Sequence, residues 1–150
     1  MLISARKAAT AAAKLENFNT GALYTSPMLR AYETARIIGH HLHLKPNIHN
    51  GLIEGNFGIA EGVSMEIVRR WPEFADWTNP DSAYLDSHYK DGESKRFIRD
   101  RAMRALEDIC NTCDADDIII VTHSAVARLL NWTAGSTVRR IMPNAAISEL

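Results

Sequence analysis

Three side chains that can bind or protonate a phosphate ester follow segments with strand-like sequence. Arg30, Glu54 and His123 each come just after such a segment, and His123 directly precedes a predicted helix. Because the carboxyl ends of parallel strands meet at one edge of a sheet, we expect the three side chains to lie together. A guanidinium and an imidazole beside helix-terminal amides can bind phosphate, and a neighbouring carboxyl group can supply a proton. Taken singly, Arg30 is more typical of a surface ion pair, Glu54 of a solvated loop acid and His123 of a hydrogen-bonded core residue. Their common placement after strands favours a phosphate-binding site instead.

Two other clusters contain residue types that bind metals or perform redox chemistry. Cys110 and Cys113 are predicted to close a helix, whereas a redox-active pair opens one and uses the helix dipole to lower a thiol pKa. No further ligands stand at zinc-site spacing near this pair, so we interpret it as structural. His40, His41 and His43 lie at the end of another predicted helix, where polar side chains commonly face the last carbonyl groups. We therefore expect neither a metal site nor a cofactor.

The composition indicates a single globular domain over residues 1–150. The chain is 46% hydrophobic, enough for a buried core, and its 17 basic and 18 acidic residues form no long run of one sign. That balance of charges gives no electrostatic reason to expect nucleic acid or an anionic membrane as a partner. No apolar run approaches the roughly 20 residues that a membrane-spanning helix needs. The first acid is Glu16, which leaves a transit peptide conceivable, but we interpret the Ala-rich start as an amphipathic helix of a cytoplasmic protein.

Helices and strands are predicted to alternate along the chain. Helices are expected over 4–17, 27–42, from Ser64 to before Pro72, over 94–113 and 125–132. Strands are expected over 22–25, 118–122 and 145–150, and residues 48–53 are expected to be extended with a bulge or tight turn at Asn50 and Gly51. Ser94 is expected to cap the long helix, and 71–91 is expected to be a polar surface excursion. The strand Ile118–Thr122 lacks polar alternation, which is typical of a strand covered on both faces. This pattern predicts a three-layer α/β fold with a mainly parallel sheet and helices on both faces.

Four segments, in this order, resemble the histidine phosphatase superfamily of phosphoglycerate-mutase-like enzymes, which pass a phosphoryl group through a phosphohistidine. The segments are ALYTSPMLRAYETARII, LIEGNFGIAEG, DGESKRFIRDRAMRALEDI and DIIIVTHSAVARLL. The resemblance implies that Arg30 clamps the phosphate, that Glu54 is the general acid and that His123 is the second active-site histidine. It also maps the family's late Asn-Ala-Ser segment onto Asn144, Ala145 and Ala146. The implied ligand is a small phosphorylated molecule.

The resemblance is incomplete at the attacking group. The family opens with a strand that ends in Arg-His-Gly and carries the nucleophilic histidine, whereas residues 1–21 contain no histidine. In the family that strand lies next to the strand bearing the second histidine, so we expect an unpaired apolar edge along Ile118–Val121 that favours self-association. His123 is also followed by Ser124 where the family has Gly. We interpret the chain as a histidine phosphatase domain truncated at both ends, without its first strand and inactive.

Three alternatives remain for the function. The short joint between Glu54 and Gly92 resembles small phosphatases more than glycolytic mutases, which carry a longer insertion there. A non-catalytic module that binds a phosphorylated ligand is the main alternative. Attack by His123 itself is disfavoured, because the family places this histidine across the phosphate from the nucleophile. A hydrolase with Ser124 as nucleophile is disfavoured because THSAV lacks the Gly-x-Ser-x-Gly turn that exposes such a serine.

Overall fold

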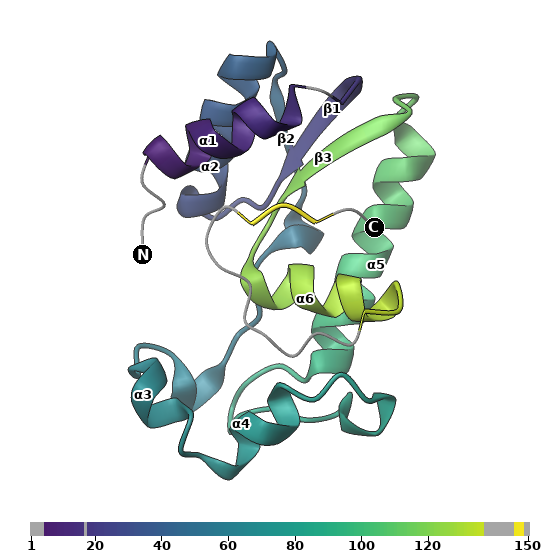
Figure 1. The fold of residues 1–150 in the computed structure, drawn as a ribbon. Coiled ribbons are helices and arrows are strands. Elements are labelled where there is room, and N and C mark those ends of the chain that lie inside the picture. The colour runs from purple at the N-terminus through teal and green to yellow at the C-terminus, as the bar shows by residue number, and fades with distance from the viewer. Residues whose placement is uncertain (1–4, 17, 137–145, 149–150) are drawn as a thin grey trace.

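The computed structural model describes residues 5–16, 18–136 and 146–148, and it confirms a layered α/β fold around a parallel sheet (Figure 1). Among the described residues the sheet has three strands in the order β2-β1-β3: β1 (Thr20–Thr25) lies between β2 (Pro46–Ile48) and β3 (Asp117–Val121). Both pairings are parallel. Helices α1 (Ala5–Leu15) and α2 (Leu29–Leu42) cover one face, and α5 (Lys95–Thr112) covers the other.

The α1/α2 layer follows the predicted helical periodicity. Ala12, Ala35 and Ile38 are buried against Leu23 of β1, while Ser4, the predicted cap of the first helix, lies outside the described residues. At the end of α2, a Cβ on Gly39 would come within 2.3 Å of the Leu44 carbonyl oxygen, so only glycine lets the chain turn back there. This turn leads directly into β2 and keeps α2 close to the sheet.

Helix α5 is the best predicted element. The Ser94 side chain accepts a hydrogen bond from the Phe97 amide at 3.2 Å, which confirms the predicted cap. Its buried stripe contains Ile98, Ala102, Ala105 and Ile109, which are spaced at helical intervals. Cys113 is the residue that ends the helix, so the cysteine pair does close a helix, and both cysteines are free thiols.

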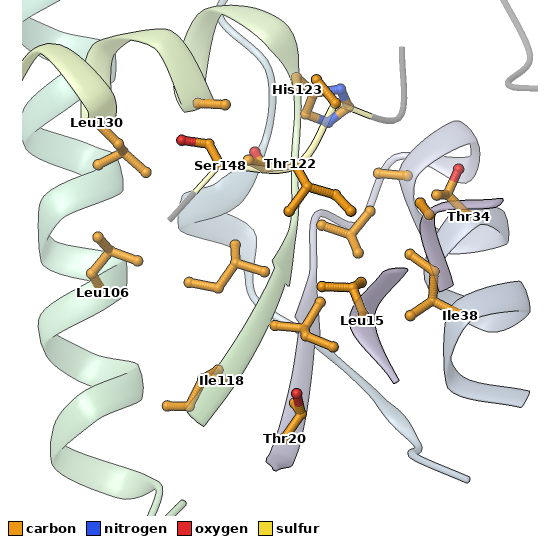
Figure 2. A pocket seen from close by; sticks show the side chains of 18 of the residues that line it. Leu15, Thr20, Thr34, Ile38, Leu106, Ile118, Thr122, His123, Leu130 and Ser148 are labelled. Carbon is orange, nitrogen blue, oxygen red and sulfur yellow. The ribbon is translucent and has the colours of Figure 1, made fainter. Parts of the chain in front are cut away.

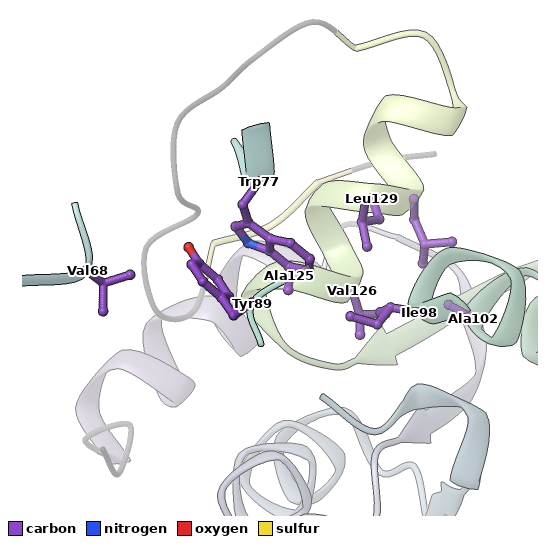
Figure 3. Close-up of a cluster of buried hydrophobic side chains, with 9 residues drawn as sticks. Val68, Trp77, Tyr89, Ile98, Ala102, Ala125, Val126 and Leu129 are labelled. Carbon is purple, nitrogen blue, oxygen red and sulfur yellow. The ribbon is translucent and has the colours of Figure 1, made fainter. Parts of the chain in front are cut away.

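The segment 71–91 lies largely at the surface, as predicted, but it also contributes two buried rings and a short helix that the sequence did not indicate. The region contains α4 (Pro72–Trp77) and a 3-10 turn (Ser82–Tyr84), and it follows the short helix α3 (Met65–Val68). Trp77 and Tyr89 are buried, and the Trp77 and Phe57 rings meet edge to face with centroids 5.4 Å apart. We call this the aromatic core (Figure 3); its buried members are Val68, Trp77, Tyr89, Ile98, Ala102, Ala125, Val126, Leu129 and Leu130. The burial of these large rings makes part of the segment a core element, although most of the residues around them are polar.

The extended segment expected over 48–53 is only partly confirmed. The interruption expected at Asn50 and Gly51 is present as a 3-10 turn over Asn50–Leu52, but β2 ends before it, at Ile48. A Cβ on Gly51 would lie 2.6 Å from the Ala105 side chain, so this turn packs tightly on α5. At the other end, residues 146–148 have no regular secondary structure, whereas Asn144, Ala145 and residues 149–150 lie outside the described residues.

Helix α6 (Ser124–Thr133) follows β3 immediately, as predicted, with His123 as the residue before its first turn. It packs on α5 through Val126 and Leu129. Within the described part of the chain, no helix is long and apolar enough to cross a membrane.

Candidate functional site

Arg30, Glu54 and His123 all line one cavity of about 900 Å³. Figure 2 shows this cavity between the α1/α2 layer and the α5/α6 layer, with β3 running along it and His123 at the carboxyl end of the strand. The structure therefore brings together the three side chains that sequence reasoning selected. His123 follows β3 after one residue, and Arg30 lies in the first turn of α2, the helix that follows β1. Glu54 reaches the same place from the 3-10 turn after β2.

Arg30 supplies the positive charge of the site. It is the second residue of α2, and the preceding turn is closed by a hydrogen bond from the Ser26 amide to the Val121 carbonyl oxygen at 3.0 Å. This bond ties the start of α2 to the end of β3. The charge of Arg30 lowers the pKa of both Glu54 and His123, so its guanidinium lies close enough to act on both groups. A half-buried guanidinium at this position is suited to a phosphate dianion.

Burial raises the pKa of the Glu54 carboxyl group above its ordinary value. Hydrogen bonds from the Gly55 and Ala125 amides and the charges of Arg30 and Arg128 oppose that increase without cancelling it. The Ala125 amide belongs to the first turn of α6, so Glu54 lies at the positive end of that helix. A carboxyl group that holds its proton to a higher pH than usual is suited to protonate a leaving oxygen.

His123 is a neutral imidazole in this structure. Burial first, and then the charges of Arg30 and Arg101, lower its pKa to about 4. Its Nε2 atom lies 2.7 Å from the Ser26 hydroxyl oxygen, which also accepts a hydrogen bond from the Met28 amide at 3.2 Å. The ring is therefore held in one orientation at the carboxyl end of β3, where it lines the cavity.

Sequence reasoning missed Arg101, which holds the loop that carries Glu54. From α5, its Nη1 donates to the carbonyl oxygens of Gly51 and Ile53, each at 2.8 Å, and its Nη2 lies 3.4 Å from the Glu54 carbonyl oxygen. Thr122 adds a hydrogen bond to the Leu52 carbonyl oxygen at 2.8 Å from the end of β3. The basic residue was visible in the helix, but its target lies 50 positions earlier in the chain, so no local pattern could have identified it.

Ser26 and Arg128 were also missed. Ser26 is fully buried and bonds to a histidine 97 positions later. Arg128 is buried on α6, with its guanidinium 5.1 Å from the centre of the Trp132 ring, and its charge acts on Glu54 from outside the cavity lining. Each of these two roles depends on a contact with a residue that is distant in the sequence, so only the structure reveals it.

The segment 54–58 is fastened to the start of α5 by Glu93. The Glu93 carboxylate accepts a hydrogen bond from the Asn56 amide, and the Glu93 amide donates to the Asn56 carbonyl oxygen, each at 2.8 Å. Gly58 has φ +52°, and a Cβ there would lie 2.0 Å from the Lys90 carbonyl oxygen. The two segments approach so closely that a side chain at this position would force them apart.

Of the clusters first considered for metal binding, the three histidines lie outside the lining of this cavity, whereas Cys110 is part of that lining. His40 and His41 occupy the last turn of α2, and His41 pairs with Glu16. His43 adopts a left-handed conformation just after that helix. Within the described ranges there is no group of three or more histidine, cysteine or acidic side chains that could hold a metal ion.

All six histidines lie in the described part of the chain, and His123 is the only one that lines the cavity. While Asp116 and Asp117 line the cavity at the amino end of β3, the lining at the carboxyl end of the strand thus contains one imidazole, one guanidinium and the Glu54 carboxyl group. This set can bind a phosphoryl group and donate a proton, and its one imidazole is held against Ser26.

Comparison with known proteins places these features in context. The sequence model of the histidine phosphatase superfamily, branch 1, matches residues 4–150. The uncharacterized phosphatase PhoE of Bacillus subtilis is 28% identical over 117 residues, which cover 77% of this chain and 54% of PhoE. The chain therefore spans about half the length of that relative.

Solved structures share the fold. Bacillus stearothermophilus YhfR is 27% identical, with a TM-score of 0.70 over 86% of this chain and 63% of YhfR. A mycobacterial glucosyl-3-phosphoglycerate phosphatase is 18% identical, with a TM-score of 0.74 over 86% of this chain and 65% of that protein, a likeness in fold alone.

Proposed function

Because the chain belongs to branch 1 of the histidine phosphatase superfamily, we propose that its cavity binds the phosphoryl group of a small phosphorylated molecule. The observation that carries the proposal is the convergence of Arg30, Glu54 and His123 on one cavity. Arg30 pairs with the phosphoryl oxygens, and the neutral His123 donates a hydrogen bond through one ring nitrogen. Glu54, protonated to a higher pH than an ordinary carboxyl group, faces the leaving oxygen.

The 150-residue chain alone is proposed to turn over phosphomonoesters negligibly. In the family the phosphoryl group passes to a histidine of an Arg-His-Gly segment, and residues 1–21 carry no histidine. His123 is engaged with Ser26 and is assigned to phosphate stabilisation. Loss of a nucleophile from a group of residues that act together costs on the order of a million-fold in rate. The chain by itself is therefore a phosphate-binding domain.

A non-catalytic role in binding a phosphorylated ligand is the second candidate. It uses the same Arg30 and His123, and it is favoured by the same shortage of imidazoles in the cavity. We also propose that the domain acts in the cytoplasm and without a cofactor. The free thiols of Cys110 and Cys113 suit a reducing compartment.

Binding and turnover measurements test the proposal together. Inorganic phosphate should bind in a titration calorimeter, and Arg30→Ala should weaken that binding at least tenfold, whereas Arg36→Ala on the exposed side of α2 should not. Hydrolysis of p-nitrophenyl phosphate by the 150-residue chain should stay at background. Equal phosphate affinity of the two variants would refute the binding site. Robust hydrolysis that disappears in His123→Ala would refute the proposed inactivity and make His123 the nucleophile.

A further inference from the structure

Arg128 is a buried cation that lies outside the lining of the cavity. It is 4% exposed, and its Nε atom has no hydrogen-bond partner within the described part of the chain. Its guanidinium group lies 5.1 Å from the centre of the Trp132 ring. Because a buried charge without a counter-charge strongly destabilises a fold, the groups around Arg128 must account for its position.

Three titratable side chains interact with the charge of Arg128. Burial raises the pKa of Tyr89 to about 12, so this hydroxyl group stays neutral at physiological pH. Burial and the repulsion from Arg128 lower the pKa of Lys95 to about 8, so Lys95 is a second cation rather than a counter-charge. Of the described acidic side chains, Glu54 is the one whose charge acts on Arg128. Glu54 is therefore the counter-charge of the buried guanidinium group.

The first turn of α6 brings these two groups together. The Ala125 amide donates a hydrogen bond to the Glu54 carboxyl group, and Arg128 stands three residues later on the same face of the helix. Helical side chains lean toward the amino end of their helix, which directs Arg128 over the turn that contains Ala125. Glu54 lines the cavity whereas Arg128 does not, so the charge of Arg128 reaches Glu54 from the interior of the protein.

The two arginines that act on Glu54 respond differently to a bound phosphoryl group. Arg30 lines the cavity, and in the proposed function it pairs with the phosphoryl oxygens. Its charge is then shared with the ligand, while the ligand adds negative charge beside Glu54. Arg128 is buried outside the cavity lining and does not reach the ligand, so its charge continues to act on Glu54 alone.

We propose that Arg128 is a positioning residue of the phosphate site: it holds the Glu54 carboxyl group at the first turn of α6 and supplies the positive charge that remains beside it when a phosphoryl group occupies Arg30. This role rests on the proposed function of the cavity. Binding of a dianion makes Glu54 take up a proton from solvent, and Arg128 sets the pH at which it does so. When that proton passes to a leaving oxygen, an O–H bond forms and Glu54 becomes a carboxylate, which Arg128 stabilises.

The other titratable groups at this end of the cavity do not replace Arg128. His123 is neutral above its pKa of about 4. Arg101 donates hydrogen bonds to backbone carbonyl groups of the loop that carries Glu54, and its charge acts on His123. The charges that act on the Glu54 carboxyl group are those of Arg30 and Arg128. Once Arg30 is paired with a ligand, Arg128 is the cation left to this carboxyl group.

A ¹³C NMR titration of the Glu54 carboxyl group in the complete chain tests the pair without a ligand. Glu54→Gln identifies the signal by its loss. Arg128→Met removes the charge and keeps a long side chain, and we expect it to raise the pKa of Glu54 by about half a pH unit or more. Arg128→Lys keeps the charge and should hold this pKa close to its native value. An unchanged pKa in a folded Arg128→Met variant would overturn the proposal.

Lys95→Met is the matched control. Lys95 is also buried, and its Nζ atom lies 5.5 Å from the centre of the same Trp132 ring, but its charge is not among those that act on Glu54. Its Nζ atom donates to two backbone carbonyl oxygens at 2.8 Å each, so Lys95→Met should lower the melting temperature and leave the pKa of Glu54 unchanged. Equal rises of this pKa in Lys95→Met and Arg128→Met would show that packing around Trp132, rather than the charge of Arg128, controls Glu54.

If Arg128→Met does not fold, Arg128→Lys still tests the pair. The pKa of the ammonium group introduced at position 128 can be followed by ¹³C NMR of its ε carbon. Adding Glu54→Gln to Arg128→Lys should lower this pKa, because the carboxylate no longer stabilises the charged form. Equal values with and without Glu54→Gln would overturn the proposal.

Sulfate binding connects the pair to the site, because this dianion does not itself titrate near neutral pH. Calorimetry in two buffers of different ionisation enthalpy measures the protons that the protein takes up on binding. We expect uptake in the native chain, none in Glu54→Gln, and uptake at higher pH in Arg128→Met. Absence of both sulfate and phosphate binding in the native chain would refute the proposed function, while the ligand-free titration of Glu54 still decides the pairing with Arg128. Sulfate binding with the same pH dependence of uptake in Arg128→Met would refute the role of Arg128 alone.

Discussion

The aromatic core and the cavity lie on two sides of the same helix, α6, and they are packed very differently. Ala125, Val126 and Leu129 are buried in the aromatic core, where α6 meets α5 and the α3/α4 region (Figure 3). Ala127 and Asn131 of the same helix border an open cavity of about 900 Å³. Residues 118–121 of β3, which belong to the strand that sequence patterning marks as buried on both faces, are only partly buried and line this cavity. One side of α6 stabilises the fold, and the other side is available for ligands.

The largest expected effect is a difference in stability between a substitution in the aromatic core and one in the cavity wall. Trp77→Ala removes a buried ring that contacts Phe57 and Tyr89, so we expect it to lower the free energy of unfolding by about 3–5 kcal/mol or to prevent folding. Leu106→Ala, in the cavity wall, enlarges a space that already exists, and we expect a cost of about 1 kcal/mol. Urea denaturation followed by circular dichroism measures both. Equal losses would mean that the cavity side is packed as tightly as the aromatic core.

Acid should destabilise the cavity side through His123. Its folded-state pKa of about 4 lies below the unfolded value of 6.5, so the unfolded chain takes up the proton first. Stability is therefore complete above pH 6.5 and falls as the pH drops toward 4, by at most about 1.4 kcal/mol per pH unit. His123→Asn should remove this dependence in urea titrations at several pH values. An unchanged slope in that variant would exclude His123 as the cause.

Glu54 acts in the opposite direction over part of this range. Its folded-state pKa is raised, so the stability it contributes is present at low pH and is lost as the pH rises through that pKa. Glu54→Gln should therefore make the acid-induced loss from His123 steeper. A shallower slope in Glu54→Gln would show that the carboxyl group has the opposite shift.

Arg101 connects the two sides, and its removal should lower the free energy of unfolding by less than Trp77→Ala does. Arg101→Leu leaves the carbonyl oxygens of Gly51 and Ile53 without their charged donor, and we expect a loss of about 2 kcal/mol. Because the same loop carries Glu54, phosphate affinity should also fall. Arg104→Leu, at an exposed position of the same helix, is the matched control and should change stability by less than about 0.5 kcal/mol. Arg101→Lys should recover part of the loss, since its ammonium group keeps the positive charge and can donate to these carbonyl groups but lacks the second nitrogen, which lies 3.4 Å from the Glu54 carbonyl oxygen.

The sequence predicted those parts of the molecule that depend on local periodicity. The stripe of α5 and its Ser94 cap are examples, as is the placement of His123 directly after a strand. It failed where a contact joins residues that are distant in the sequence. The turn at Asn50–Leu52 is held by Arg101, and the Trp77 ring packs on Phe57, and a short sequence window contains neither pair. Glu54 was predicted at the correct edge although the strand expected before it is a 3-10 turn.

Ser26 offers the finest test, because it affects the orientation of one ring on the cavity side. Its hydroxyl oxygen lies 2.7 Å from His123 Nε2 and accepts a hydrogen bond from the Met28 amide, so Ser26→Ala leaves the imidazole nitrogen and this amide without that partner. We expect the free energy of unfolding to fall by about 1 kcal/mol, because one neutral hydrogen bond contributes roughly that much.

If Ser26 only packs against its neighbours, its removal should change stability alone. If Ser26 positions the His123 ring, its removal should also change the balance between the two tautomers of the imidazole. The ¹⁵N chemical shifts of His123 should therefore move from those of one tautomer toward a mixture of both. Thr34→Ala, which removes a hydroxyl group that donates to the Arg30 carbonyl oxygen, is the control and should leave these shifts unchanged. Identical ¹⁵N shifts in Ser26→Ala and the native chain would show that the α6 backbone alone orients His123.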